Sequence, residues 1–493
     1  MRTGRLAAAA VSLGLSMVEA SPAEQDQPEG PIDIGSRLEL FVDDFLIESM
    51  AGLELRLQHP RSAGKIVVFD RPWEGTTSVY HTVFKDGDGY RLYYRGSSAA
   101  DYADKAQLSP EEKIVPNHES VTCMLESRDG IEWTRPSLGL VEFQGSTDNN
   151  IVWKGTASCC FAPFKDANPD APPEERYKAL GNAGPGWPNH VLKAFVSADG
   201  KRWRLASEEA AISDGKFDSL NVPFWDPVRR RYGAVYRDSD GVRSVKFATS
   251  RDFLNWTPGI WADYGGTPRE HLYTNGTQPY FRAPHILIAL PKRFVPWRTY
   301  HSTMPTAGVS EAVFMSSRDG IHWDRRFMEA FIRPGRDPRN WVHRTNMPSA
   351  GVVATSDDEM SLYVSRHYTF PSAHLERMVL RTDGFVSIHA GHEGGEWVSR
   401  PLIFEGGNLV LNLATSAAGS IRLEVQDTNG RPLPGFALEE SPLIWGDEIE
   451  HTVSWEREYG RPASDQPLKR IAGKPVRLRF LMKDADLYSL RFR

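Results

Sequence analysis

The sequence predicts an all-β protein, a five-bladed β-propeller followed by a C-terminal β-sandwich. Three observations lead to this fold class. A short turn segment recurs along most of the chain, and the stretches between its copies look like pairs of short apolar strands. The repeat stops near residue 390, where the pattern of strands and turns changes. We therefore expect the propeller over residues 31–390 and the sandwich over residues 391–493.

The repeated segment has the form Ser-x-Asp-x-x-x-Trp. Four full copies are SRDGIEW (127–133), SADGKRW (197–203), SRDFLNW (250–256) and SRDGIHW (317–323), and a fifth, RTDGFVS (381–387), keeps only the Asp and Gly. Ser and Asp side chains hydrogen-bond the backbone of tight turns, and glycine accepts the positive φ that such turns need. Each copy follows a short apolar stretch, so it should join the two outer strands of a blade.

Two further strand candidates lie between successive copies. Residues 78–96 contain two apolar-rich runs separated by Asp-Gly-Asp-Gly, and residues 221–237 repeat the scheme around an Asp-Pro turn. Four strands per unit, arranged radially, bury their faces against neighbouring units. The apolar run at residues 38–48 is expected to lend a strand to the last blade and so to close the ring.

The sequence after residue 390 follows a different pattern, in which strands with alternating polar and apolar residues are joined by short turns. Val476, Leu478 and Phe480 should face one side of a strand, while Arg477 and Arg479 face the other. This alternation is typical of a sheet packed on one face only, and it predicts a separate β-sandwich.

The first twenty residues have the layout of a secretory leader. Arg2 and Arg5 precede an apolar run at 6–17 and a small-residue exit, Val-Glu-Ala, at 18–20. We expect residues 1–20 to be a signal peptide and the protein to be exported, to the periplasm or the extracellular space. No later stretch approaches the roughly 20 apolar residues of a membrane helix, so no membrane span is expected.

Charge and cysteine content exclude several partners. The formal charge is −6 and no basic block stands out, so nucleic acid is not an expected partner. Of the three cysteines, Cys159 and Cys160 are adjacent and geometrically poor partners for each other, and the set does not support a metal site. The Asp-Gly-Asp-Gly pattern at 86–89 lacks the later acidic ligand of a calcium loop. No metal or cofactor is predicted.

The turn motif, the leader and the propeller followed by a sandwich resemble the five-bladed propeller glycoside hydrolases of families 32, 43 and 68, closest to secreted family 32-like proteins. The resemblance covers nearly all the mature chain as architecture. It implies a carbohydrate substrate and carboxylates near the propeller axis, where the innermost strands begin, one acting as base or nucleophile and one as acid. The family 32 signature Trp-x-Asn-Asp-Pro-Asn is absent, so sucrose or fructan is not the expected substrate.

Three carboxylates stand at the expected starts of innermost strands. Glu74 in PWEGTTS, Asp218 in FDSLN and Glu270 in REHLYTN are the catalytic candidates that the resemblance implies. Glu74 stands where the family usually has an aspartate, and the second unit offers only Thr156 and Ser158 where a stabilising carboxylate belongs. The alternative for each candidate is a turn or cap residue, a common role for acids beside Gly or Ser.

A set of polar and aromatic residues is expected to line the substrate site. Sugar rings stack on aromatic faces and accept hydrogen bonds from amides, imidazoles and guanidinium groups. Arg344 and Arg282 would suit a carboxylate or sulfate on the sugar, although inter-blade ion pairs are the alternative. Glu119 is a reserve acid. The predicted substrate-binding residues are His81, Glu119, Asn221, His271, Tyr273, Asn275 and Arg344.

Three functions remain open at this point. The first is a glycoside hydrolase that cleaves a poly- or oligosaccharide with a carboxylate acid and base. The second is a catalytically silent glycan-binding propeller. The third is a lyase for uronic acid glycans, with a Tyr or His base and an arginine that neutralises the sugar carboxylate, for which Tyr273, His271 and Arg344 are available. The fold alone does not choose among them.

Overall fold

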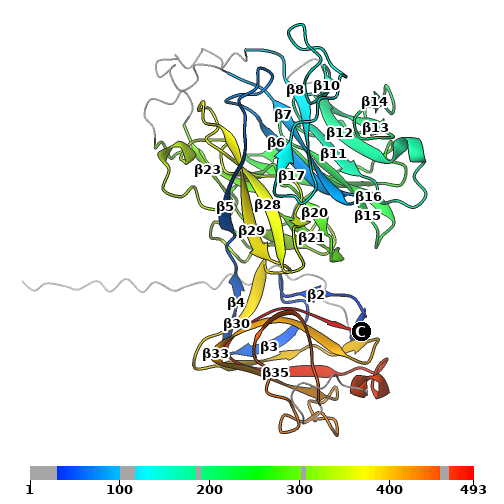
Figure 1. Ribbon diagram of the computed structural model, residues 1–493. Helices are drawn as coiled ribbons and strands as arrows, with labels where there is room; N and C mark the ends of the chain where they lie inside the picture. The colour runs from blue at the N-terminus through cyan, green and yellow to red at the C-terminus, as the bar shows by residue number, and fades with distance from the viewer. Residues whose placement is uncertain (1–29, 100–116, 185–189, 301–306, 456–465) are drawn as a thin grey trace, which may run out of the picture.

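The computed structural model describes residues 30–99, 117–184, 190–300, 307–455 and 466–493 (Figure 1). Within these ranges the chain contains strands, no α-helix and three short 3-10 helices, so the predicted all-β class is confirmed. The 3-10 helices are η1 (Pro173–Glu175), η2 (Pro338–Asn340) and η3 (Pro467–Arg470). No helix in this part of the chain is long and apolar enough to cross a membrane. The predicted signal peptide lies outside the described residues.

The upper body in Figure 1 consists of antiparallel sheets that follow one another along the chain. Sheet 1 contains β6 (Val79–Asp86), β7 (Gly89–Gly96) and β8 (Val121–Ser127), with β9 (Trp133–Thr134) and β10 (Ile151–Lys154) both paired to β8. Sheet 2 contains β11 (Phe161–Lys165), β12 (Tyr177–Ala183), β13 (Val191–Ser197) and β14 (Arg204–Leu205). Sheet 3 contains β15 (Val222–Asp226), β16 (Arg231–Asp240), β17 (Val242–Ser250) and β18 (Ile260–Trp261).

The fourth and fifth units are less regular than the first three. Sheet 4 contains β20 (Gln278–Tyr280), β21 (Ala283–Ala289), β24 (Met315–Ser317) and β25 (Trp323–Asp324). A companion sheet continues it with β19 (His271–Tyr273), β22 (Lys292–Val295) and β23 (Val309–Ala312). Sheet 5 contains β26 (Met347–Pro348) and β27 (Val353–Ala354), both paired to β28 (Glu359–Arg366), followed by β29 (His374–Arg381) and β5 (Arg61–Val68).

The repeated segments form the turns that the sequence predicted. In the first copy, the Ser127 hydroxyl accepts the N–H of Gly130 at 2.8 Å, and Asp129 Oδ1 accepts the N–H groups of Ile131 and Glu132 at 2.8 and 2.9 Å. The indole N–H of Trp133 then donates to the Gly130 carbonyl at 3.1 Å. The copies at 197–203, 250–256 and 317–323 repeat these bonds. The motif therefore closes its own turn with local hydrogen bonds, to which distant side chains such as Tyr363 and Tyr93 add one on the glycine carbonyl.

The first strands of successive sheets contact one another. β6 contacts β11, β11 contacts β15, and β15 contacts β20. A separate run of contacts joins β23 to β26 and β26 to β6. The last step is closed by backbone hydrogen bonds, because Ala350 N donates to the His81 carbonyl and Val83 N donates to the Ala350 carbonyl, both at 2.8 Å.

The strand that completes sheet 5 is β5, which pairs antiparallel with β29. The prediction that residues 38–48 would supply this strand is wrong. Within that run, β2 (Glu39–Leu40) pairs with β35 (Arg477–Phe492) of the lower body. Its apolar side chains, Leu38, Leu40 and Val42, pack with Phe314 and Phe385 between the two bodies, so burial against both bodies holds the run there.

The lower body is one large sheet folded around its own core (Figure 1). Its strands are β2, β3 (Ile47–Ala51), β4 (Leu53–Leu57), β30 (Val386–Ala390), β31 (Gly395–Ser399), β33 (Leu409–Gln426), β34 (Asp447–Thr452) and β35, beside a parallel pair of β1 (Ile32–Gly35) and β32 (Leu402–Phe404). The register between β33 and β35 shifts between Thr415 and Ser420, so the two halves of each long strand have different neighbours. The amino-terminal segment 32–57 thus belongs to the lower body by strand pairing.

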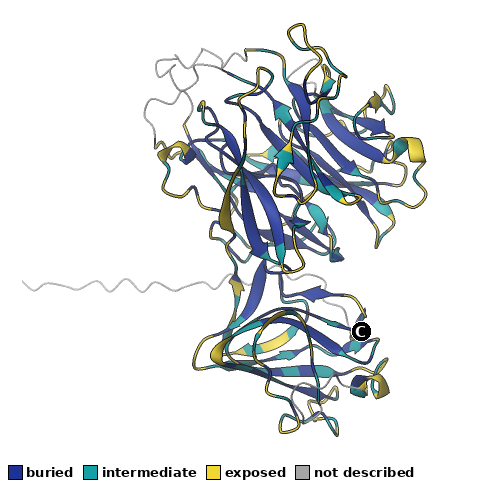
Figure 2. Cartoon of the chain, in the orientation of Figure 1, coloured by how far each residue is buried: buried dark blue, intermediate teal, exposed yellow. Residues whose placement is uncertain are grey.

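The strands of both bodies are largely buried, as their dark blue colour in Figure 2 shows, and apolar side chains form the core clusters. Val476, Leu478 and Phe480 are buried while Arg477 and Arg479 are partly exposed, as the alternation in the sequence predicted. At the junction of the bodies, Arg318 donates to Asp43 at 2.7 Å and to Glu39 at 3.0 Å.

Candidate functional site

Glu74 is buried in an ion pair. Its two carboxylate oxygens accept Nε and Nη2 of Arg135, each at 2.8 Å, and the hydroxyl of Tyr94 donates to the same carboxylate. The Glu74 side chain is fully buried. All its strong acceptor positions are therefore occupied by the protein.

Glu270 and Glu119 lie in different environments from Glu74. Glu270 is partly exposed and pairs with Arg325 and, at 3.4 Å, with Arg293. Glu119 is exposed on the segment that enters β8, and its backbone carbonyl accepts a hydrogen bond from His118 Nδ1 at 2.8 Å. The structure therefore does not bring these two carboxylates together with Glu74.

Asp218 is the one catalytic candidate that forms no ion pair within the described ranges. It is exposed and stands four residues before β15, where the chain enters sheet 3. Its charge acts on the buried Tyr80 and Tyr273 hydroxyls and on the Lys292 ammonium group. Asp218 therefore borders a cluster of titratable side chains that come from several sheets.

This group, which we call the basic cluster, gathers cations and tyrosines from sheets 1, 3, 4 and 5. Its defining feature is an excess of positive charge over negative charge. Its members are Arg95, Arg237, Arg243, Lys292, Arg344, Tyr80, Tyr273, Tyr368 and Asp218. Five of them are basic and one is acidic. Arginines in such numbers, with their planar donors, suit a bound carboxylate or sulfate.

Three basic side chains of the cluster contact Tyr273. Its hydroxyl accepts Lys292 Nζ at 2.7 Å and Arg243 Nη1 at 2.9 Å, and the Arg237 guanidinium lies 5.7 Å from its ring centre. Burial raises the pKa of Tyr273 even though the surrounding arginines act in the opposite direction. Burial, together with the charges of Arg344 and Arg243, lowers the pKa of Lys292 well below its usual range. Tyr273 is therefore a neutral hydroxyl in a cationic setting.

Tyr368 has the opposite electrostatics. Burial alone would raise its pKa, but the charges of Arg344 and Arg95, each within 3.5 Å of the hydroxyl, outweigh burial and lower it. Arg95 also lies 4.9 Å from the ring centre of Tyr80. Of the three tyrosines of the cluster, Tyr368 therefore loses its proton more easily than Tyr80 and Tyr273.

Backbone strain marks the same region. Tyr80, Thr274 and Arg344 have φ values of 64°, 52° and 62°, in the left-handed region that side-chain-bearing residues rarely occupy. Such residues cost about 1–3 kcal/mol each and gather at functional sites, where the surrounding structure holds them. All three stand where sheets 1, 4 and 5 meet their neighbours.

The other predicted binding residues surround or support this cluster. His271 Nδ1 accepts the N–H of Arg243 at 3.1 Å, and Asn221 Oδ1 accepts the N–H of Arg237 at 2.9 Å, so both hold the backbone of cluster residues. Asn275 accepts the Thr277 hydroxyl at 2.7 Å.

His81 is fully buried next to Tyr80, and neither of its ring nitrogens has a hydrogen-bond partner among the described residues. It stacks on Phe69 and Tyr94. Burial and the charge of Arg95 lower its pKa to about 3. His81 is therefore a neutral core histidine behind the cluster.

Several cluster members were missed in the sequence. Arg95, Arg237, Lys292 and Tyr368 stand in or just beyond the second strand of each unit, in YRLYYRG, GAVYRDS, ALPKRFV and YVSRHYT. A basic or aromatic residue at this shared position is a usable signal, but it becomes informative only once the strands are aligned as equivalent.

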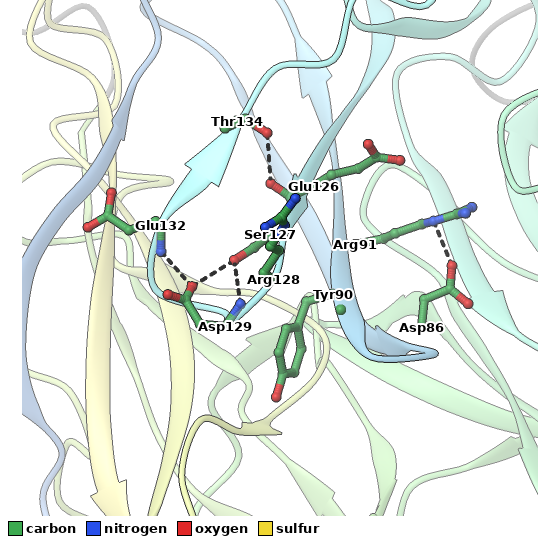
Figure 3. Close-up of a pocket in the computed structure, with 10 residues that line it drawn as sticks. Asp86, Tyr90, Arg91, Glu126, Ser127, Arg128, Asp129, Glu132 and Thr134 are labelled. Carbon is green, nitrogen blue, oxygen red and sulfur yellow. Dashed lines mark hydrogen bonds and ion pairs between the residues drawn. The ribbon is translucent and has the colours of Figure 1, made fainter.

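A depression lies at the end of sheet 1 that includes Asp86 and Ser127 (Figure 3). This cleft of about 650 Å³ is lined by residues that include Asp86, Arg91, Glu126 and Asp129. Asp86 is paired with Arg91 at 2.7 Å, and Asp129 Oδ1 accepts turn N–H groups, so both carboxylates serve the fold. Within the described residues, no three His, Cys, Asp or Glu side chains are grouped to hold a metal ion.

Comparisons with known proteins give similarity at the level of the chain path. No family model and no curated protein matches the chain. An N-acetylgalactosamine deacetylase from F. plautii, solved with blood group B trisaccharide, is 13% identical over 68% of this chain and 97% of its own, with a TM-score of 0.45. The Bombyx mori GH32 β-fructofuranosidase BmSUC1 is 10% identical over 88% of this chain and 94% of its own, at 0.42.

A glycoside hydrolase of family GH130 is 16% identical over 67% of this chain and 94% of its own, with a TM-score of 0.39. The chain is thus similar in its path to two glycoside hydrolases. These identities and TM-scores transfer no activity, substrate or residue role to it.

Proposed function

We propose that the five sheets are the blades of one propeller, that the lower body is a β-sandwich, and that the basic cluster is the axial site of an exported carbohydrate-active enzyme. The contacts from β6 through β11 and β15 to β20, and from β26 back to β6, support the propeller. The strand pairing of segments 32–57 and 386–492 supports the sandwich.

The observation that carries the proposed substrate is the charge of the cluster. Four arginines face a single carboxylate among the described residues, and Lys292, whose pKa is lowered, is not needed for this excess of positive charge. Partly buried cations without anions are costly, so a ligand that supplies negative charge is favoured over a neutral one. We infer that the substrate is an anionic glycan, whose sugars bear a carboxylate.

The chemistry that best fits the cluster is β-elimination at a uronic acid. Arg344 and Arg95 neutralise the sugar carboxylate, which acidifies the neighbouring C5–H bond. Tyr368, whose pKa those arginines lower, takes the C5 proton as its phenolate. The C4–O bond breaks as the C4–C5 double bond forms, and Tyr273, a neutral hydroxyl, gives its proton to the leaving oxygen. No water is consumed.

Hydrolysis is the second candidate, and the unpaired, exposed carboxylate of Asp218 is the observation that favours it. A hydrolase needs two carboxyl groups about 5–10 Å apart across the glycosidic bond. Glu74 and Glu270 are both engaged by arginines. The elimination reaction needs no second carboxylate, which is why we place it first.

The experiment compares two products on the same substrates. Polygalacturonate, alginate and a neutral xylan are incubated with the protein, and both new reducing ends and the ultraviolet absorbance of an unsaturated uronate are followed. We expect both signals to rise together on a uronate polymer. Tyr368→Phe should lower the rate by about 10²-fold or more. Arg344→Gln should weaken the reaction too, while Arg128→Gln, an exposed arginine of the cleft in Figure 3, serves as the matched control and should leave it unchanged.

The outcomes separate the candidates. Reducing ends without the ultraviolet signal, abolished by Asp218→Asn, would establish hydrolysis instead. Binding of a uronate polymer with neither signal would indicate a glycan-binding propeller. Release from neutral xylan alone would contradict the anionic substrate.

A further inference from the structure

Two adjacent cysteines occupy the turn that leads into β11. Cys159 and Cys160 place their sulfur atoms 2.7 Å apart, far closer than two thiols without a specific interaction. The turn is tight: Ala157 has a φ of 72°, and its carbonyl accepts the N–H of Cys160 at 3.2 Å. The third cysteine, Cys123, is buried on β8 and takes no part in this contact.

The pair lies where the first strands of the sheets meet. Cys160 is fully buried against Val79, Tyr80 and Tyr368, and Cys159 packs on the same group while remaining partly exposed. The charges of Arg95 and Asp218 both act on the two sulfurs. The pair therefore adjoins the basic cluster and shares a buried core with two of its tyrosines, Tyr80 and Tyr368.

We propose that Cys159 and Cys160 form a vicinal disulfide beside the basic cluster, and that this bond is a redox switch for the site. Adjacent Cα atoms are about 3.8 Å apart, below the usual 4.4–6.8 Å span of disulfides. A bond between neighbours is therefore strained and easily reduced, and strained disulfides are the labile, regulatory ones. The strain explains why the sequence indicated that two adjacent cysteines are geometrically poor partners.

The bond forms by exchange with a low-molecular-weight disulfide such as oxidised glutathione. The hydrogen bond from Cys160 and the charge of Arg95 lower the pKa of the Cys159 thiol, which favours its thiolate. That thiolate attacks the external disulfide and releases one thiolate. Cys160, on losing its proton, then attacks the Cys159 sulfur and releases the second. The external disulfide has taken up two electrons, and the two protons of the cysteines end on the two released thiols.

The redox state of the cysteine pair affects the basic cluster through the side chains packed between them. Cys160 shares one buried core with Tyr80 and Tyr368, and Arg95 lies over the Tyr80 ring and donates toward the Tyr368 hydroxyl. Reduction replaces the S–S bond of about 2.05 Å by two thiols whose sulfurs lie 2.7 Å apart, and this change shifts the side chains packed around them. Because catalytic geometry tolerates little displacement, we expect reduction to slow the reaction about tenfold or more.

The bond itself is tested by counting thiols, which requires no substrate. The full-length protein is equilibrated with oxidised glutathione, denatured without reductant, alkylated with iodoacetamide and weighed intact. We expect one label, on Cys123, and none in the Cys123→Ser variant. Three labels, or a dimer on a non-reducing gel, would overturn the proposal. Prior reduction should raise the count to three.

The switch is tested on polygalacturonate and therefore rests on the proposed function. Turnover is compared between the oxidised and the reduced protein, with Cys123→Ser as the control that should keep the full response. The double variant C159S/C160S should respond to neither condition. Equal turnover of both redox forms would overturn the switch. If no glycan is turned over, the melting temperatures of the two forms replace the rate, and equal values would equally overturn it.

Discussion

Replacing Glu74 by Gln separates a structural role for this buried carboxylate from a catalytic one. Glu74 is fully buried and binds Arg135 through two N–O contacts of 2.8 Å, with a further hydrogen bond from Tyr94. Glutamine keeps the shape of the side chain and one acceptor oxygen. It removes the negative charge and turns an amide group toward the guanidinium. The variant therefore leaves Arg135 charged without a close buried anion.

The expected cost follows from that geometry. Removing one partner of a buried ion pair costs about 3–5 kcal/mol. Arg135 retains 21% of its side-chain exposure, so water partly solvates the stranded charge. We therefore expect the free energy of unfolding to fall by about 3 kcal/mol, the lower end of that range. Turnover per folded molecule should be unchanged.

Urea unfolding followed by tryptophan fluorescence measures the loss. Asp218→Asn is the matched carboxylate-to-amide control, because Asp218 is exposed and unpaired within the described ranges, and its effect should stay within about 0.5 kcal/mol. Adding Arg135→Met to Glu74→Gln should recover part of the loss, which a double-mutant cycle quantifies. Unchanged stability of Glu74→Gln together with lost turnover would refute the structural role and return Glu74 to the catalytic candidates.

Three further predictions concern stability. Burial and the charge of Arg95 lower the pKa of His81 to about 3 in the folded protein, so the unfolded chain binds a proton on this residue more tightly. The stability that neutral His81 gives the folded state is therefore complete above about pH 6.5, and the free energy of unfolding falls by about 1.4 kcal/mol per pH unit below it. His81→Phe should flatten the acid limb of a pH–stability curve, and an unaltered curve would exclude His81 as its cause. Asp199→Ala should cost about 1–2 kcal/mol in urea unfolding, since Oδ1 accepts two turn N–H groups at 2.8 Å; no change would mean that the turn does not need its aspartate. Arg318→Met strands the carboxylate of Asp43 and removes one of three basic partners of Glu39 between the bodies, so calorimetry should show two separated transitions, where a single unshifted one would argue against this anchor.

The sequence by itself determined the elements whose hydrogen bonds are local. Each Ser-x-Asp-x-x-x-Trp copy closes its own turn with hydrogen bonds inside seven residues. The turn can therefore be predicted from those seven residues alone. The alternation around Val476–Phe480 likewise predicted one buried face. For the same reason the all-β class followed from the sequence, and the glycosidase-like resemblance rested on these turns.

Only the tertiary structure decided which distant residues meet. Glu74 and Arg135 are 61 positions apart, and the basic cluster joins Tyr80 to Tyr368 across nearly the whole upper body. No local period connects such residues, because their proximity follows from how the sheets pack and not from hydrogen bonds within a turn. The same holds for β5, which completes sheet 5 by pairing with a strand some three hundred positions later. Sequence patterns thus located the strands and turns. The packing of the sheets determined that β5 completes sheet 5 and that Glu74 pairs with Arg135. It also determined which basic side chains lie around Asp218.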